Sequence, residues 1–147
     1  MKRPLLIHLL YMALGYALAV LVATTVVVLI QGLPSVFPDQ GAWGSFYNYL
    51  NDFPSMFLFG LLMTAIYGLP GWLITVVAAE WRGERRKYWF AIAGSLTAIL
   101  AIVIASRGQR LFADWLLNGG ILVGGFFGGL AYWAIAGKKS ANWKQTA

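Results

Sequence analysis

The chain has 147 residues, of which 60% are hydrophobic and only 11% are charged, and it contains no cysteine. A soluble domain carries roughly 25% charged residues, so this composition excludes an ordinary water-soluble protein and indicates that most of the surface faces lipid. The lack of cysteine excludes disulfides, thiolate metal sites and thiol nucleophiles, and the length suits a single domain over 1–147.

Four uncharged stretches are each long enough to cross a bilayer core, which needs roughly 20 apolar residues in a helix. Because lipid offers the backbone no hydrogen-bonding partner, each stretch is expected to be helical. The predicted helices cover about 4–31, 53–79, 88–106 and 111–137. The predicted fold class is therefore all-α, a polytopic membrane protein with a four-transmembrane-helix bundle.

The first stretch follows Lys2 and Arg3 and in this respect resembles a secretory signal, with "ALA" at 17–19 as the cleavage site. The apolar run continues to Ile30, however, which is longer than the core of a typical signal. We interpret this stretch as a retained anchor, and cleavage is the alternative.

The loop before the second stretch predicts a short interfacial helix over about 42–51. Its apolar side chains follow the i, i+3, i+4, i+7 spacing of one helix face, and they are Trp43, Phe46, Tyr47 and Leu50. Such a face on the outer side of the membrane is either a lid or docking surface for a partner, or an amphipathic connector that lies among lipid headgroups. The sequence favours the connector.

Basic residues gather on one side of the predicted helices. The amino end, the loop between the second and third helices and the carboxyl tail hold nine of the 11 lysines and arginines. The positive-inside rule therefore places both termini in the cytoplasm. The membrane is expected to be a bacterial inner membrane. The loop residues Arg82, Arg85, Arg86 and Lys87 are expected to meet anionic lipid headgroups. This distribution accounts for the net charge of +6 without nucleic acid as a partner.

Small residues recur at helix-packing periods, which matters because helices in a bilayer associate by close packing. The last helix carries two such rows, the first of Gly120, Gly124 and Gly128 and the second of Gly125 and Gly129. The third helix carries Ala91, Gly94, Ala98, Ala101 and Ala105, and the first helix carries Gly15 and Ala19. The second row faces either another membrane protein, such as a second copy, or another neighbour within the bundle. The sequence leaves both alternatives open.

Groups able to perform chemistry are scarce. No aspartate, glutamate, lysine or arginine lies within the uncharged stretches, of which the fourth begins after Asp114 and covers 115–137, and the single histidine, His8, is about one turn from the amino end. Proton relays usually place ionisable groups inside the membrane, so His8 is expected at the level of the headgroups instead. No nucleophile–base pair, carboxylate pair or set of metal ligands is evident. We therefore expect no enzyme, no cofactor and no metal.

The segment "GGFFGGLAYWAIAGKK" at the end of the last stretch resembles the last helix of small four-span bacterial inner-membrane proteins of unassigned function. The resemblance covers mainly this helix, and it implies the topology rather than an activity. Small multidrug transporters share the number of helices, but they use a glutamate in the first helix, where this chain has none.

We therefore expect a non-catalytic integral inner-membrane protein, an accessory, assembly or scaffold subunit that packs through its glycine and alanine seams. The expected partners are membrane lipids together with further copies in a homo-oligomer or a larger membrane complex. The alternative is an oligomeric passive channel or carrier for a small solute, lined by the hydroxyl groups of the helices.

Overall fold

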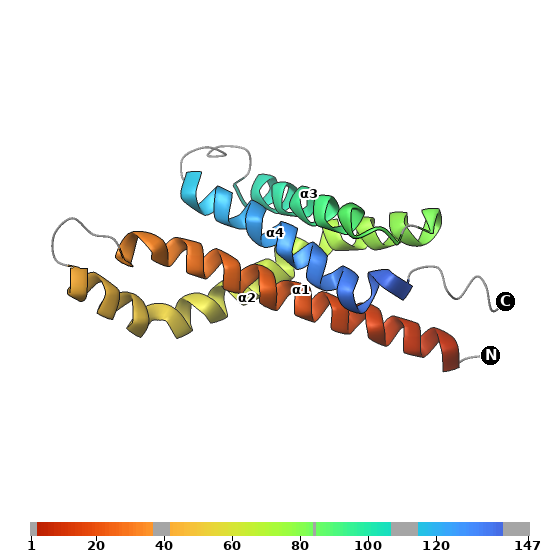
Figure 1. Ribbon diagram of the computed structural model, residues 1–147, viewed down its shortest axis with the longest axis horizontal. Helices are drawn as coiled ribbons and strands as arrows, with labels where there is room; N and C mark the ends of the chain where they lie inside the picture. Colours follow the sequence, from red (N-terminus) through yellow and green to blue (C-terminus); the bar gives the residue numbers. More distant parts are fainter. Residues whose placement is uncertain (1–2, 37–41, 84, 107–114, 140–147) are drawn as a thin grey trace.

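Four long α-helices make up most of the chain (Figure 1). The computed structural model describes residues 3–36, 42–83, 85–106 and 115–139. The helices are α1 (Arg3–Val36), α2 (Ala42–Arg82), α3 (Lys87–Ser106) and α4 (Trp115–Ile135), and a short 3₁₀ turn, η1 (Gly137–Lys139), follows. All four are long and apolar enough to span a membrane, and the described ranges contain no strand. The predicted all-α fold with four membrane-length helices is confirmed.

The segment 42–51 is helical, but it is not the separate interfacial helix that its spacing predicts. It forms the first turns of α2, which continues without a break to Arg82. The expected start of the second helix at residue 53 is therefore wrong as well. Tyr47 and Leu50 are exposed on these first turns. The side chains of Trp43 and Phe46 are not among those that the structure describes.

Aromatic side chains four residues apart brace α2 across Pro54. The ring centroids of Tyr49 and Phe53 are 6.1 Å apart, and those of Phe53 and Phe57 are 5.9 Å apart. Pairs at this spacing stabilise a helix because they lie on the same face. Proline, for its part, removes one backbone donor and frees only the carbonyl of Leu50. The helix therefore persists where the polar sequence predicts a boundary.

α2 ends where Gly83 adopts a φ of 67°. Glycine takes this left-handed conformation without steric strain, and it stops a helix there. The short hairpin that follows is tied to the end of α4, because the indole N–H of Trp133 donates a 2.8 Å hydrogen bond to the carbonyl oxygen of Arg85.

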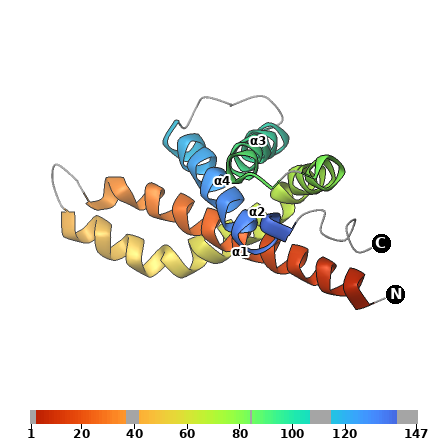
Figure 2. The same ribbon diagram turned by 45° about the vertical axis from the view of Figure 1, so that its right-hand side comes forward.

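The helices form a ring in which each packs against its two neighbours. α1 and α3 both pack closely against α2 and α4, whereas the backbones of the diagonal pairs lie farther apart. The contacts between α1 and α4 are the most extensive, and both views show α4 lying between α1 and α3 (Figures 1 and 2). The last helix is therefore the central packing element.

The first glycine row of α4 lies against α1, backbone to backbone. A Cβ atom added to Gly124 would lie 2.8 Å from the carbonyl oxygen of Ala23, and one added to Gly128 would lie 2.9 Å from that of Ala19. Separations under 3.0 Å are essentially absent from real Cβ contacts, so only glycine permits this approach.

The second row lies against α3 in the same way. A Cβ atom on Gly125 would lie 2.6 Å from the carbonyl oxygen of Gly94, and one on Gly129 would collide with the carbonyl oxygen of Phe90. Both rows are therefore used inside one chain, each against a different helix.

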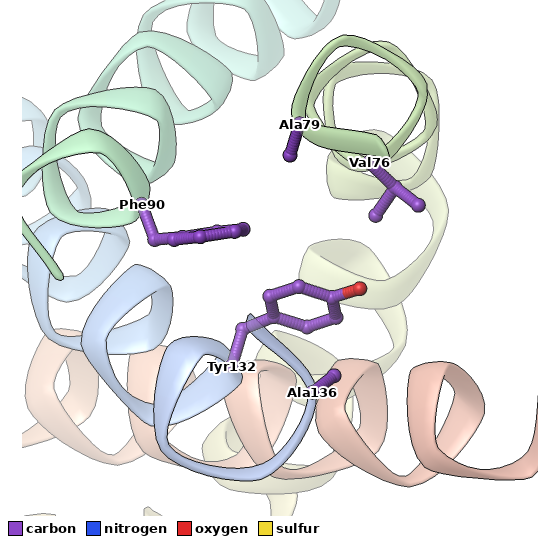
Figure 3. Packing of buried hydrophobic residues seen from close by; sticks show 5 residues of the cluster. All are labelled: Val76, Ala79, Phe90, Tyr132 and Ala136. Atoms are coloured by element: carbon purple, nitrogen blue, oxygen red, sulfur yellow. The ribbon is translucent and has the colours of Figure 1, made fainter. Parts of the chain in front are cut away.

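A small cluster of buried side chains fills the bundle where α2 ends and α3 begins (Figure 3). Phe90 and Tyr132 meet at its centre with ring centroids 5.7 Å apart. Val76, Ala79 and Ala136 complete the cluster from α2 and from the end of α4. This cluster lies at one end of the bundle, and Val20, Ala23 and Val28 of α1 are buried farther along it.

We expect replacement of Gly129 with alanine to lower the free energy of unfolding by about 1–3 kcal/mol, the usual cost of overpacking. The added methyl group would push the backbones of α3 and α4 apart. Gly119 provides the control, because a Cβ atom there meets nothing within 4 Å. Alanine at Gly119 should be neutral or stabilising by up to about 1 kcal/mol, since it favours a helix. Denaturant unfolding in detergent measures both variants, and equal destabilisation would contradict the described packing.

Candidate functional site: a cavity between the four helices

The four helices surround a cavity of about 480 Å³, and every helix contributes to its wall. It exists because the diagonal helix pairs stay apart while small side chains face the space between them. Gly60, Gly94 and Ala101 are among these small residues. Cavities of roughly 300–1,000 Å³ are typical of small-molecule sites, so this space is the candidate site.

The wall of the cavity is mainly aliphatic and aromatic. Its polar side chains carry hydroxyl groups or an amide, and they are Tyr16, Thr24, Gln31, Thr64, Tyr67, Thr75, Thr97 and Tyr132. Among the described residues that line the cavity, none is aspartate, glutamate, lysine, arginine or histidine. The site therefore offers no general acid or base of ordinary strength.

Several of these hydroxyl protons are already used within the protein. Tyr16 donates to the carbonyl oxygen of Ala65 over 2.5 Å, which joins α1 to α2. Thr24 is almost fully buried and donates to the hydroxyl of Thr64 over 3.2 Å, which joins the same two helices. The Thr75 hydroxyl donates to the backbone of its own helix. The wall is thus less polar than its composition indicates.

Aromatic rings close one end of the cavity. The rings of Tyr16 and Trp72 have centroids 4.6 Å apart, and those of Trp72 and Tyr132 are 6.2 Å apart. Phe90 and Tyr132 belong both to the cavity wall and to the buried cluster of Figure 3. The core cluster therefore forms the floor of the cavity.

An ionisable pair lies close to this closed end and joins α1 to α2. His8 Nε2 is 3.2 Å from Glu80 Oε1, and the two side chains are only 16% and 17% exposed. Because α2 continues to Arg82, Glu80 belongs to the membrane-length helix. The uncharged stretch 53–79 itself contains no carboxylate, and Glu80 follows it directly on the same helix.

The predicted seam residues divide between helix packing and the cavity wall. Ala91 and Ala98 pack on the second glycine row of α4, Gly120 lies against Ile30, and Gly15 meets Tyr132 and Ala136. Ala101 and Ala105 line the cavity, and so do Gly94 and Ala98. The sequence thus identified these positions as close-packing ones but did not reveal that part of the α3 seam faces an open space.

The predicted headgroup residues are exposed at the end of the bundle where α2 passes into α3. They are Arg82, Arg85, Arg86 and Lys87. The guanidinium group of Arg82 lies 5.6 Å from the centre of the Trp89 ring, and the ammonium group of Lys87 lies 5.2 Å from that of Tyr88. Aromatic and basic groups paired in this way suit the headgroup layer of a membrane.

No family profile matches the chain, and no curated protein or solved structure is significantly similar to it. Within the described residues, no three potential metal ligands come together. The functional argument therefore rests on the cavity and on the groups around it.

The His8–Glu80 contact should show as coupling in a double-mutant cycle. We expect His8→Ala and Glu80→Ala each to lower the free energy of unfolding by about 1–3 kcal/mol, because each removes a polar contact between two largely buried side chains. The double variant should lose less than the sum by about 1 kcal/mol or more. Glu80→Gln retains a hydrogen-bonding group and should lose less than Glu80→Ala. Strict additivity, measured by unfolding in detergent, would argue against the contact.

Proposed function

We propose that this chain is a non-catalytic integral membrane protein that binds a small hydrophobic molecule inside its own helix bundle, as a carrier or binding protein. The cavity of about 480 Å³ supports this proposal, because it lies within a single chain and has an aromatic floor. Its described wall carries no ionisable group other than tyrosine. Such a wall favours binding over acid–base or metal-assisted catalysis.

The glycine rows favour this function over a scaffold that packs through the same seams. Gly124 and Gly128 lie against α1, and Gly125 and Gly129 lie against α3. Neither row is left for a partner in the bilayer. A binding protein needs only the cavity of its own bundle, so this function does not require the oligomer that a channel formed between copies would need.

The first turns of α2 favour a second function, that of an accessory or assembly subunit of a larger membrane complex or homo-oligomer. They lie beside α1 and away from α3 and α4 in both views (Figures 1 and 2). Tyr47 and Leu50 are exposed on them. An exposed aromatic and aliphatic surface on a projecting helix pair suits contact with another membrane protein.

We further propose that the membrane is the bacterial inner membrane and that both termini are cytoplasmic. The exposed basic residues of the α2–α3 hairpin support this orientation. Anionic lipid headgroups are the partners that their charge favours, at about 1 kcal/mol for each basic residue near the surface.

Cysteine labelling tests the orientation, because the chain has no cysteine of its own. Arg86 and Asn48 are both exposed and lie near opposite ends of α2. In spheroplasts, we expect a membrane-impermeant maleimide to label Asn48→Cys directly and Arg86→Cys only after the membrane is permeabilised. The reverse pattern would contradict the proposed topology.

The same substitution, alanine to phenylalanine, tests binding at one position in the cavity wall and at one position outside it. Ala101 lines the cavity, whereas Ala17 is exposed and lies outside its wall. We expect Ala101→Phe to weaken binding of a hydrocarbon probe about tenfold, because the ring overfills the site at a cost of about 1–3 kcal/mol. Ala17→Phe should leave binding unchanged.

The probe is a terminally brominated n-alkanol added to vesicles that contain the protein, and the readout is quenching of tryptophan fluorescence. Trp72 lines the cavity, so Trp72→Phe should remove the saturable part of the quenching. Circular dichroism confirms that the variants keep their helices. Quenching that never saturates, or that Ala101→Phe leaves unchanged, would contradict the proposed function.

A further inference from the structure

We infer that the cavity takes one extended, unbranched hydrocarbon chain of about 16–18 carbons, held in single file. This inference rests on the proposed binding function and names its ligand class. This hydrocarbon chain is either that of a free single-chain amphiphile or one tail of a membrane phospholipid. Three independent properties of the cavity lead to this ligand.

The first property is length. The residues that line the cavity run from Tyr16 to Gln31 on α1, from Phe90 to Ala105 on α3 and from Leu117 to Tyr132 on α4. Each of these three stretches covers fifteen residue steps, which correspond to about 22 Å along a helix, and the lining residues of α2 run over nineteen steps from Met56 to Thr75. Carbon–carbon bonds of about 1.52 Å meeting at about 111° advance an extended chain by about 1.25 Å per carbon. The cavity is thus about 18 carbons long.

The second property is volume. A water molecule takes up about 30 Å³ in the liquid, and a methylene group is of similar size. The 480 Å³ of the cavity therefore hold about 16 such groups. This number is close to the roughly 18 carbons that the length allows for one extended chain. The space accordingly fits one chain.

The third property is the chemistry of the wall. The hydroxyl protons of Tyr16, Thr24 and Thr75 are donated to groups of the protein itself. They are therefore not directed at a solute, and charged groups are lacking among the described lining residues. A charged solute would lose its hydration in such a site without meeting a charge of opposite sign. A hydrocarbon chain has no hydration to lose, and it gains dispersion contacts along the wall.

The aromatic floor sets a limit to the length of the chain. Phe90 and Tyr132 block the cavity at one end. Gly68 lines the wall near this floor, and a Cβ atom added there would lie 3.8 Å from the hydroxyl oxygen of Tyr16, in ordinary contact. A larger side chain at Gly68 therefore fills the closed end without colliding with a neighbouring backbone.

A chain-length series tests the inference. Unlabelled n-alkanols of about 10 to 22 carbons compete with the brominated probe at equal mole fractions in the vesicles. Wild-type protein should bind best at about 16–18 carbons, because shorter chains leave space and longer ones meet the floor. Phosphatidylcholines with the same chain lengths form the second arm. Competition by both series assigns the site to phospholipid tails, and competition by alkanols alone assigns it to free amphiphiles.

Gly68→Leu provides the sharper measurement. Its four side-chain carbons should displace about four ligand carbons and move the optimum to about 13, because the filled space is close-packed. Gly119→Leu is the matched control, since Gly119 lies outside the cavity wall and has open space around it. It should leave the optimum where it is in the wild type.

The possible outcomes separate the two proposals. Saturable binding that increases steadily with chain length, with no optimum and no shift in Gly68→Leu, would overturn the single-file inference and leave the proposed function standing. The absence of saturable binding by any chain would overturn both. An optimum that shifts in Gly68→Leu and stays in place in Gly119→Leu would support the inference.

Discussion

Backbone contact on both flanks of α4 sets the spacing of the helices. On one flank the carbonyl oxygens of Ala19 and Ala23 stand where side chains of α4 would otherwise lie, and on the other flank the backbone of α3 does so. Lipid tails are as apolar as leucine, so the helices are held by close packing and not by hydrophobic exclusion from the surroundings. Since α1 and α3 are each fixed to α4, they cannot close on one another. The space at the centre of the bundle is a direct result of this constraint.

The polar groups of the bundle act mainly as connections between α1 and α2. Tyr16 and Thr24 bond to α2 beside the cavity, and His8 contacts Glu80 beyond its floor. Polar contacts of this kind are directional, whereas glycine seams allow small rotations of one helix about another. The combination fixes both the separation and the rotation of the helices, and it keeps ionisable groups out of the described cavity wall. The wall is thus adapted to an apolar occupant.

The number and type of the helices follow from the sequence because hydropathy and backbone satisfaction in lipid act locally along the chain. The start of α2 was missed for the opposite reason: polar residues and Pro54 predict a boundary, but the aromatic contacts on both sides of Phe53 override it. Glycine spacing identified the seams of α4, although it could not tell which helix lies on each. The cavity and the His8–Glu80 contact depend on residues far apart in the chain, and no local pattern contains that information.

The position of α4 in the chain has a consequence for biogenesis. Helices enter the membrane in the order in which they are synthesised, and the N-terminal parts of a chain generally fold first. α1, α2 and α3 therefore spend an interval in the bilayer before the helix that binds α1 to α3 is made. During that interval the contacts of α2 with its two neighbours are the main ones that join the described helices. Insertion of α4 then completes the ring and forms the cavity in the same step, so the nascent bundle has no such cavity until its last helix arrives.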